Sequence, residues 1–590
     1  MAKPNDNNDS SSVIEIRTEE IQDFDAQVKK FKEGKWDEIA FQAFRLKQGV
    51  YGQRQPDAQM VRVKAPFGGL SAIQLEALGE VAEKYAPLGK GHVTTRENIQ
   101  YHHVPIQDTP KLMEILGDAG LSTREACGNT VRNVTGCPLA GVCEKEPFDV
   151  TPYAGAYARY FLRHQFTQAL PRKIKTAFSG CESDCAITSI HDIGFLPVIK
   201  NGEHGFKMVV GGGTSIMPKL APTLYEFVDL NNYLKITEAV LRIFHRSDEL
   251  RKNRMKARIK FLIARIGIDE FRKMVEEELQ KEWAQKSYDP TSLLFIDDEE
   301  ADAPEIPNES TQSPNGDASQ FERWISTNVQ TQKQSEYMVV TAKLPLGDIN
   351  SKQFFQLADL TRKYSNARCR LSHQQNLVIR WVPTTKLYDL WLELKNIGFA
   401  ESEAHRITDV VSCPGTDSCK LGITSSMGLG RAVTEKLKEI DSGDALVNKM
   451  HVKMSGCPNG CGQHHIADIG MHGAAGRGAS GQIPAYEFFV AGSYAPGNPQ
   501  LGQRLKTKIP AKLVPEMLEK IIDFYKENRN DDEEFGAFVS RVGVSTLEPI
   551  LQQSSVKEVG ELNRETIDTY IDWDKTIIYK LERGEGECAI

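Results

Sequence analysis

The chain has 590 residues and a mass of 66.0 kDa, more than a single hydrophobic core usually serves, so we expect two or three packed domains. A net charge of -8 and an isoelectric point near 6.0 argue against a nucleic-acid-binding protein, which needs a basic surface to neutralise phosphates. No stretch approaches about 18 uninterrupted apolar residues, and the start of the chain has no basic and apolar signal segment, so we expect a cytoplasmic protein without a membrane span.

The first part of the chain predicts a polar tail followed by a compact unit. Residues 1–20 are rich in Asn, Asp and Ser, which predicts a disordered tail. Residues 21–125 carry the pattern of a β-α-β-β-α unit, the material of an α+β domain with a mixed sheet. Its expected elements are a strand at 60–65, a helix at 70–85, two strands within 92–104 and a helix at 111–120.

The same order of elements recurs in residues 321–405, so the chain is expected to be an internal duplication. The repeated elements are a strand at 338–344, a helix at 352–364, two strands within 368–382 and a helix at 385–398. Residues 126–288 and 406–590 form a second pair of repeats, in which the strand and helix at 206–213 and 233–245 correspond to 486–492 and 513–528. Residues 289–320 are dense in Pro, Asp, Glu, Asn and Ser and are predicted to be a linker.

Two features of residues 126–288 each have two interpretations. Gly211, Gly212 and Gly213 form either a turn or a place where the backbone approaches a cofactor. Residues 251–265 predict a basic helix, which is either a solvated face or a contact with cofactor carboxylates or an acidic electron donor.

The eleven cysteines are more informative by their spacing than by their number. A long intracellular chain is not expected to depend on disulfides. Cys127, Cys369 and Cys588 stand alone and are interpreted as small buried hydrophobic residues. The other eight form two quartets, each with a five-residue and then a three-residue gap: the first-half quartet (Cys137, Cys143, Cys181, Cys185) and the second-half quartet (Cys413, Cys419, Cys457, Cys461).

Four thiolates on two short loops can hold an iron–sulfur cube, and Pro and Gly within the second-half loops favour the tight turns that this requires. A four-cysteine zinc site is the alternative, although its paired ligands usually lie two to four residues apart. The spacing favours the cluster and leaves zinc open.

The segment Gly456-Cys-Pro-Asn-Gly-Cys461-Gly resembles the signature of the assimilatory sirohaem sulfite and nitrite reductases, and the resemblance extends from about Gly49 to the helix after Ala511. It implies a pseudo-twofold duplicated α+β fold with two ferredoxin-like half-domains and two reductase repeats. It also implies sirohaem and a [4Fe–4S] cluster, with Cys413, Cys419, Cys457 and Cys461 as cluster ligands and Cys461 bridging to the sirohaem iron.

The first half contains cations that resemble the family's substrate-binding residues. Arg offers planar contacts to an oxyanion and Lys a compact donor. The resemblance implies that residues 126–288 form the anion-binding repeat and residues 406–590 the cluster and sirohaem repeat. By this resemblance, the anion is bound by Arg96, Arg132, Lys173 and Lys175. Sirohaem is also bound by the first three of these residues.

Lys175 favours sulfite over nitrite, because related ferredoxin-dependent nitrite reductases typically carry asparagine at this place and a second cation suits the sulfite dianion. The expected reaction is the six-electron reduction of sulfite to sulfide, with nitrite to ammonia as the alternative. No flavin or nicotinamide domain is evident, so electrons must come from ferredoxin or a separate flavoprotein, and we expect a monomer. A non-catalytic zinc or iron–sulfur protein, or a degenerate chain that stores or senses sirohaem, remains as an alternative.

The first-half quartet departs from the family, which uses one cluster bound by the second half. Alignment of the halves places Gln374, Thr408, Lys449 and His451 opposite the four cations, so a second anion site is not expected. The first-half quartet is a second [4Fe–4S] cluster, a metal-free thiol set or another metal site.

Overall fold

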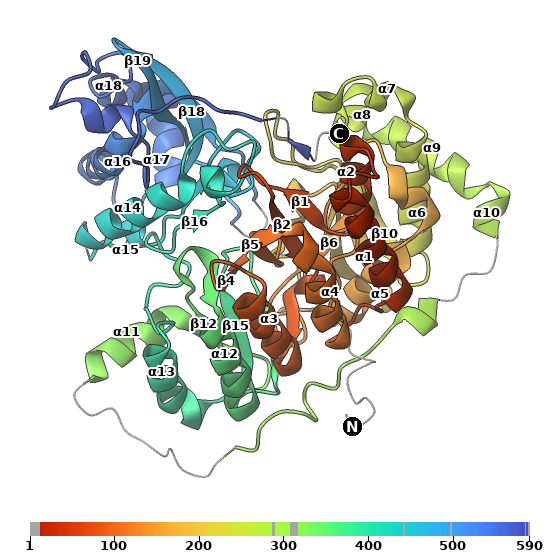
Figure 1. Ribbon diagram of the computed structural model, residues 1–590. Helices are drawn as coiled ribbons and strands as arrows, with labels where there is room; N and C mark the ends of the chain where they lie inside the picture. Colours follow the sequence, from red (N-terminus) through yellow and green to blue (C-terminus); the bar gives the residue numbers. More distant parts are fainter. Residues whose placement is uncertain are drawn as a thin grey trace.

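The computed structural model describes residues 12–285, 290–306, 317–440, 443–495, 498–584 and 586–587. It has two half-domains that pack against each other and two larger repeats, each with its own sheet (Figure 1). None of the helices in these ranges is long and apolar enough to cross a membrane.

The first half-domain contains the expected β-α-β-β-α unit. A capping box between Ser71 and Gln74 starts its central helix, where each side chain satisfies a backbone N–H of the first turn. In spatial order its sheet contains β1 (Val50–Gly52), β2 (Ala58–Val63), β5 (Ile99–Pro105), β4 (Lys90–Val93) and β13 (Asp348–Asn350), and its helices are α3 (Ala72–Lys84) and α4 (Thr109–Asp118).

The second half-domain repeats this arrangement, and Asn350 and Gln353 repeat the capping box. In spatial order its sheet contains β11 (Val329–Thr331), β12 (Tyr337–Ala342), β15 (Leu377–Pro383), β14 (Arg368–Leu371) and β3 (Gly69–Ser71), and its helices are α12 (Ser351–Tyr364) and α13 (Leu387–Asn396).

The two half-domains exchange one strand each, which the sequence did not predict. β13 of the second half pairs with β4, with Ile349 opposite Gly91, and β3 of the first half pairs with β14, with Leu70 opposite Cys369. Helices α3 and α12 pack so closely that a Cβ at Gly79 would lie 3.1 Å from the Phe354 Cβ. The half-domains therefore share one hydrophobic core.

Each larger repeat has a five-stranded mixed sheet with its own core. The first sheet has the order β10-β9-β8-β7-β6 and the second β16-β17-β18-β19-β20. The strands are β6 (Val131–Gly136), β7 (Ile174–Phe178), β8 (Ile193–Lys200), β9 (Glu203–Val210) and β10 (Thr223–Asp229), and β16 (Val411–Ser412), β17 (Val452–Ser455), β18 (Ile469–Gly478), β19 (Gly481–Val490) and β20 (Gln503–Pro510).

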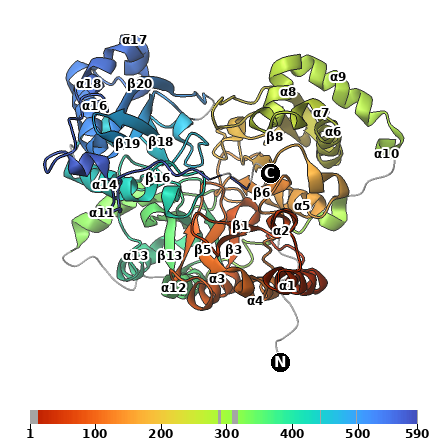
Figure 2. The same cartoon turned by 45° about the horizontal axis from the view of Figure 1, so that its top comes forward.

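Helices pack against both sheets (Figure 2). The helices expected after β9 and β19 are present. The prediction of one basic helix at 251–265 is wrong, because the chain turns at Asn253 and breaks the segment into short helices. The main helices are α5 (Thr151–Phe161), α6 (Tyr233–His245), α7 (Asp248–Arg251), α8 (Ile259–Ile266) and α9 (Ile268–Leu279), and α14 (Ser426–Glu439), α16 (Val514–Asn528) and α17 (Phe535–Val542).

Two segments that were expected to be loose are docked. The tail prediction is wrong for residues 12–20, because Ile14 is buried, its N–H donates to the Gly120 carbonyl, and α1 (Thr18–Lys32) follows; residues 1–11 lie outside the described residues. The described linker residues 290–306 run along the second half-domain, where Glu299 pairs with Arg370 and Arg380. Residue 289 and residues 307–316 lie outside the described part, and α11 (Ala318–Asn328) resumes the fold.

The C-terminal segment crosses from the second repeat to the first half, where Glu587 contacts Arg45 of α2 (Glu38–Lys47) (Figure 1). The buried Glu587 carboxylate accepts hydrogen bonds from the Arg45 guanidinium at 2.7 Å and from the Gly52 N–H. It also pairs with Lys420, which follows Cys419. This segment therefore ties the second-half cysteine loop to the first half.

Candidate functional site

The second-half quartet sits where two parallel strands end. Cys413 follows β16 directly, and Cys457 follows β17 after Gly456, whose N–H donates to the Cys413 sulfur at 3.2 Å. Burial raises the pKa of Cys413, and the charge of Cys461 raises it further. Burial and the neighbouring thiolates also raise the pKa of Cys419 to about 12. Four thiolates this close need a bound cation to coexist.

The surroundings of the second-half thiols are those that cluster ligands need. In the described part of the chain, no three His, Cys, Asp or Glu side chains surround a position suitable for a single metal ion. Backbone N–H groups also reach the sulfurs: Leu421 and Gly422 donate to Cys419, and Asn459 donates to Cys457. Such hydrogen bonds stabilise cluster thiolates. The residues present therefore fit a [4Fe–4S] cluster.

Cys461 lies at the junction of the two halves. It is the exposed member of the second-half quartet. The Thr95 hydroxyl from the first half donates to the Cys461 carbonyl at 2.7 Å, and the Thr214 hydroxyl reaches the Gly460 carbonyl at 3.5 Å. Cys461 thus lies next to the half that carries the cations.

Lys175 on β7 is the cation that the structure connects most directly to Cys461. Burial lowers the pKa of Lys175 well below its ordinary value, and the charges of Arg96 and Lys173 lower it further. The Cys461 charge acts in the opposite direction. The Lys175 N–H donates to Asp192 Oδ2 at 2.8 Å, which fixes the strand end. The structure therefore brings three of the four predicted cations together with the predicted bridging cysteine.

Arg96 is held by first-half groups. Its Nη atoms donate to the Asn133 carbonyl at 2.6 Å, to the Thr135 hydroxyl at 3.1 Å and to the Thr176 carbonyl at 3.3 Å, and contact the His191 ring. Burial lowers the pKa of Arg96 to about 10, so it remains charged near neutral pH. Its place is fixed before any anion arrives.

Arg132 and Lys173 complete the predicted set. Arg132 Nη1 donates to the Ala126 carbonyl at 2.8 Å, and its charge is close enough to lower the pKa of Arg96. The Lys173 charge acts on Lys175 in the same way. The four predicted cations therefore form one positively charged group.

Sequence reasoning missed the residues that support this group. Arg258 Nε donates to Asp192 Oδ1 at 2.7 Å, and Lys260 Nζ donates to the Thr214 carbonyl at 2.8 Å. Both come from the segment predicted as a basic helix, so two of its cations face inward. Their signal was present in the sequence, but a helical interpretation could not show which cations turn toward the site.

The glycine run serves packing. A Cβ at Gly212 would lie 2.3 Å from the Ser189 carbonyl oxygen and 2.6 Å from that of His191. Gly492 stands at the equivalent place in the second repeat, against the Ala467 and His465 carbonyls. The backbone itself therefore requires glycine at both places.

The first-half quartet lies at the equivalent ends of β6 and β7. Cys137 Sγ is 3.4 Å from Cys185 Sγ. The residue opposite Lys175 also lies where the alignment put it: the His451 backbone N–H donates to Asp468 Oδ2 as the Lys175 backbone N–H donates to Asp192 Oδ2. The positions opposite Arg96 and Arg132 hold Gln374 and Thr408, so the site next to the first-half quartet lacks both arginines.

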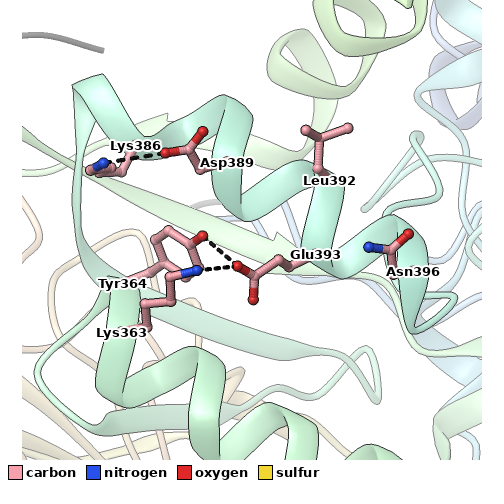
Figure 3. A pocket seen from close by; sticks show the side chains of 7 residues that line it. All are labelled: Lys363, Tyr364, Lys386, Asp389, Leu392, Glu393 and Asn396. Carbon is pink, nitrogen blue, oxygen red and sulfur yellow. Dashed lines mark hydrogen bonds and ion pairs between the residues drawn. The ribbon is translucent and has the colours of Figure 1, made fainter. Parts of the chain in front are cut away.

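A hollow of about 610 Å³ near α12 and α13 is unrelated to these residues (Figure 3). Its charged side chains pair with one another: the Tyr364 hydroxyl donates to Glu393 at 2.6 Å and Lys386 contacts Asp389 at 3.2 Å. It offers no unopposed positive charge to an anion.

Two family descriptions match the chain. "Nitrite and sulphite reductase 4Fe-4S domain" matches residues 127–283 and 403–575, and "Nitrite/Sulfite reductase ferredoxin-like half domain" matches residues 51–119 and 330–397. The chain belongs to the nitrite and sulphite reductase family. This reductase is therefore an oxidoreductase, and the expected family, duplicated α+β fold and cofactors, sirohaem and a [4Fe–4S] cluster, are confirmed.

Relatives of the reductase act on either anion. It is 28% identical over 476 residues to the ferredoxin–nitrite reductase of Synechococcus elongatus, covering 79% of this chain and 86% of that protein. It is 28% identical over 491 residues to the sulfite reductase [ferredoxin] of Mycobacterium tuberculosis, covering 82% of each. The solved structure of M. tuberculosis NirA matches with a TM-score of 0.74 and 25% identity, over 91% of this chain and 98% of that one.

Proposed function

We propose that this reductase converts sulfite to sulfide with six electrons, using the group formed by Arg96, Arg132, Lys173 and Lys175 to hold the anion. The observation that carries the proposal is the closeness of Lys175 to both Arg96 and Cys461. A dianion placed there meets several positive charges in a partly buried site, where charge pairs are stronger than in water.

Sirohaem and the [4Fe–4S] cluster, when bound, supply the coordination of the anion and the path for electrons. Cys413, Cys419, Cys457 and Cys461 would hold the cluster, and Cys461 would also contact sirohaem. Arg96, Arg132 and Lys173 would also contact the acidic groups of sirohaem.

The protein residues bind the anion and deliver protons. Sulfite consumes eight protons with its six electrons to give hydrogen sulfide and three waters. Lys175 suits a donor role, because its lowered pKa makes its Nζ proton easier to release than that of an ordinary lysine. Arg96 keeps its protons and, held by Asn133, Thr135 and Thr176, contributes fixed positive charge.

Nitrite is the second candidate, because relatives of both kinds are similar to this chain to the same degree. We propose ferredoxin as the donor, since both relatives carry it in their names. We further propose that the protein acts as a monomer in the cytoplasm.

The test is anaerobic purification followed by an absorption spectrum and parallel assays with reduced viologen. We expect tetrapyrrole and iron–sulfur bands, sulfide as the product from sulfite, and a higher kcat/KM for sulfite than for nitrite. A higher kcat/KM for nitrite would replace sulfite by the second candidate. A colourless protein without activity on either anion would reject both.

A further inference from the structure

The proposed function assigns no role to the first-half quartet. The strands that carry it are nevertheless arranged like those that carry the second-half quartet. β6 pairs with β7 in parallel with Gly136 opposite Phe178, and β16 pairs with β17 in parallel with Ser412 opposite Met454. In each repeat this is the last residue pair of the two strands, and the first cysteine of the quartet follows it directly. Cys137 and Cys181 therefore leave their sheet at the same positions as Cys413 and Cys457.

The backbone between the last two cysteines is also the same. Asp184, with φ of 51°, stands where Gly460 has φ of 69°, each one residue before the last cysteine. Ile187 and Gln463 follow with φ of 51° and 61°, and their N–H groups donate to the carbonyls of Asp184 and Gly460. A left-handed β-branched residue such as Ile187 is strained. The first half keeps the loop geometry despite this cost.

The hydrogen bonds to sulfur are repeated at equivalent residues. The Lys145 N–H donates to Cys143 as the Leu421 N–H donates to Cys419. The Ser183 N–H donates to Cys181 as the Asn459 N–H donates to Cys457, and the Ser183 hydroxyl adds a further bond. In iron–sulfur sites such N–H and O–H donors stabilise the thiolate ligands.

The four first-half thiols are neither disulfides nor ligands around one ion. They form a chain of contacts from Cys143 through Cys181 and Cys185 to Cys137. A disulfide would need about 2.05 Å between sulfurs, well below the 3.4 Å between Cys137 and Cys185. No three of these thiols, all of them among the described residues, surround a position for a single ion.

We infer that Cys137, Cys143, Cys181 and Cys185 bind a second [4Fe–4S] cluster. Binding replaces the mutual hydrogen bonds of the thiols by iron–sulfur bonds and releases their protons. Each reduction of the cube takes up one electron from the donor that serves the second-half cluster, and no protein bond is made or broken. The inference does not depend on whether sulfite or nitrite is the substrate.

A buried chain of contacts joins the two quartets. The Gly136 N–H, next to Cys137, donates to Glu97 at 2.8 Å, and Glu97 lies 3.1 Å from the His373 ring. His373 Nδ1 is 3.1 Å from the Thr95 carbonyl, and the Thr95 hydroxyl donates to the Cys461 carbonyl. A first-half cluster would therefore be connected to the catalytic junction through packed protein and could store an electron for it.

The decisive measurement is the iron and acid-labile sulfide content of anaerobically purified protein. At four irons per cube, two cubes and sirohaem predict about nine irons and about eight sulfides per chain. A Cys143→Ser/Cys181→Ser variant should fall to about five irons and about four sulfides with unchanged tetrapyrrole absorption. A Cys127→Ser/Cys369→Ser variant, which removes two buried cysteines outside both quartets, should stay at about nine.

About five irons in the wild-type protein, with or without one zinc, would overturn the inference, as would about nine in the quartet variant. Reductive titration gives a second readout that needs no variant: two cubes and sirohaem take up about three electrons per chain and a single cube with sirohaem about two. Failure of the proposed function would appear separately, as a lack of sulfide production by protein with the full iron content.

Discussion

Lys175 combines burial with two neighbouring cations, which together hold its pKa well below the ordinary value. Its identity and its neighbours in the family's segment predicted a place in the anion site, and the structure puts it beside Arg96, Lys173 and the predicted bridging cysteine. The carbonyl groups that hold Arg96 could not be predicted, because Asn133 and Thr176 reach it from separate strands. Every residue has a backbone carbonyl, so the sequence does not show which carbonyls accept hydrogen bonds from Arg96.

Replacement of Lys175 by asparagine should shift substrate preference toward nitrite. The change removes a charge-assisted hydrogen bond, which is worth about 1.5–3 kcal/mol and matters more to a dianion than to a monoanion. We expect kcat/KM for sulfite to fall by about 100-fold and that for nitrite by less than about 10-fold in viologen assays. The exposed Lys200→Asn on β8 is the control, and an equal loss for both anions would contradict the assignment.

At the scale of elements, hydrophobic periodicity predicted the half-domains well, because amphipathic helices and alternating strands carry local signals. β2, α3, β12 and α12 all lie within a few residues of their expected ranges. The docking of residues 290–306 carried no such signal. It depends on scattered polar contacts to residues distant in sequence, such as those of the largely buried Glu299 with Arg370 and Arg380.

The docked linker should loosen when Glu299 is neutralised. Burial alone would raise the pKa of Glu299, but the charges of Arg380 and Arg370 outweigh it and hold the value at about 2. Because the pKa of Glu299 in the docked linker lies below the ordinary 4.5, the ionised carboxylate stabilises docking by about 3 kcal/mol at any pH above 4.5. Glu299→Gln should therefore speed proteolysis of the linker at pH 7 by about 100-fold, whereas Glu300→Gln, at an exposed position, should have little effect.

The same contact predicts a pH dependence. Because the folded pKa is lowered, the stabilisation is fully present above about pH 4.5 and is lost as the pH falls toward 2. The difference in proteolysis rate between wild type and Glu299→Gln, measured with an acid protease, should shrink over this window. A constant difference down to pH 2 would mean that another group dominates.

At the scale of the whole molecule, the exchange of β3 and β13 makes the two half-domains interdependent. The duplication was visible in the sequence, but the exchange was not, because a three-residue strand has no periodicity and pairs equally well within its own half. Helices α3 and α12 directly follow β3 and β13 and pack against each other in the shared core, which places each short strand beside the other half's sheet.

Neither half should fold alone. Residues 12–288 would leave β4 without β13 and expose the face of α3 that α12 covers, and unpaired edges and apolar faces promote aggregation. We expect this fragment to be aggregated by size-exclusion chromatography and residues 289–590 to rescue it on co-expression. A soluble, monomeric and cooperatively unfolding fragment would contradict this.

The C-terminal tie should protect the second-half cluster. Glu587→Gln leaves Arg45 buried without its anion, at a cost of about 3 kcal/mol, and releases the tail from Lys420. We expect the variant to lose cluster iron to a chelator faster than the wild type does, as measured by the decay of the cluster's absorption. Glu582→Gln, on the exposed part of the same tail, should lose iron at the wild-type rate.

The exchanged strands also bear on ancestry. If the linker were absent, the two halves would form a twofold dimer in which each subunit lends a strand to the other, and such a dimer carries two identical sites. After fusion of the subunits into one chain, the two sites can differ in sequence. One site could then retain Arg96 and Arg132 while the other accepted Gln374 and Thr408, and on this view the first-half quartet is what remains of the second site.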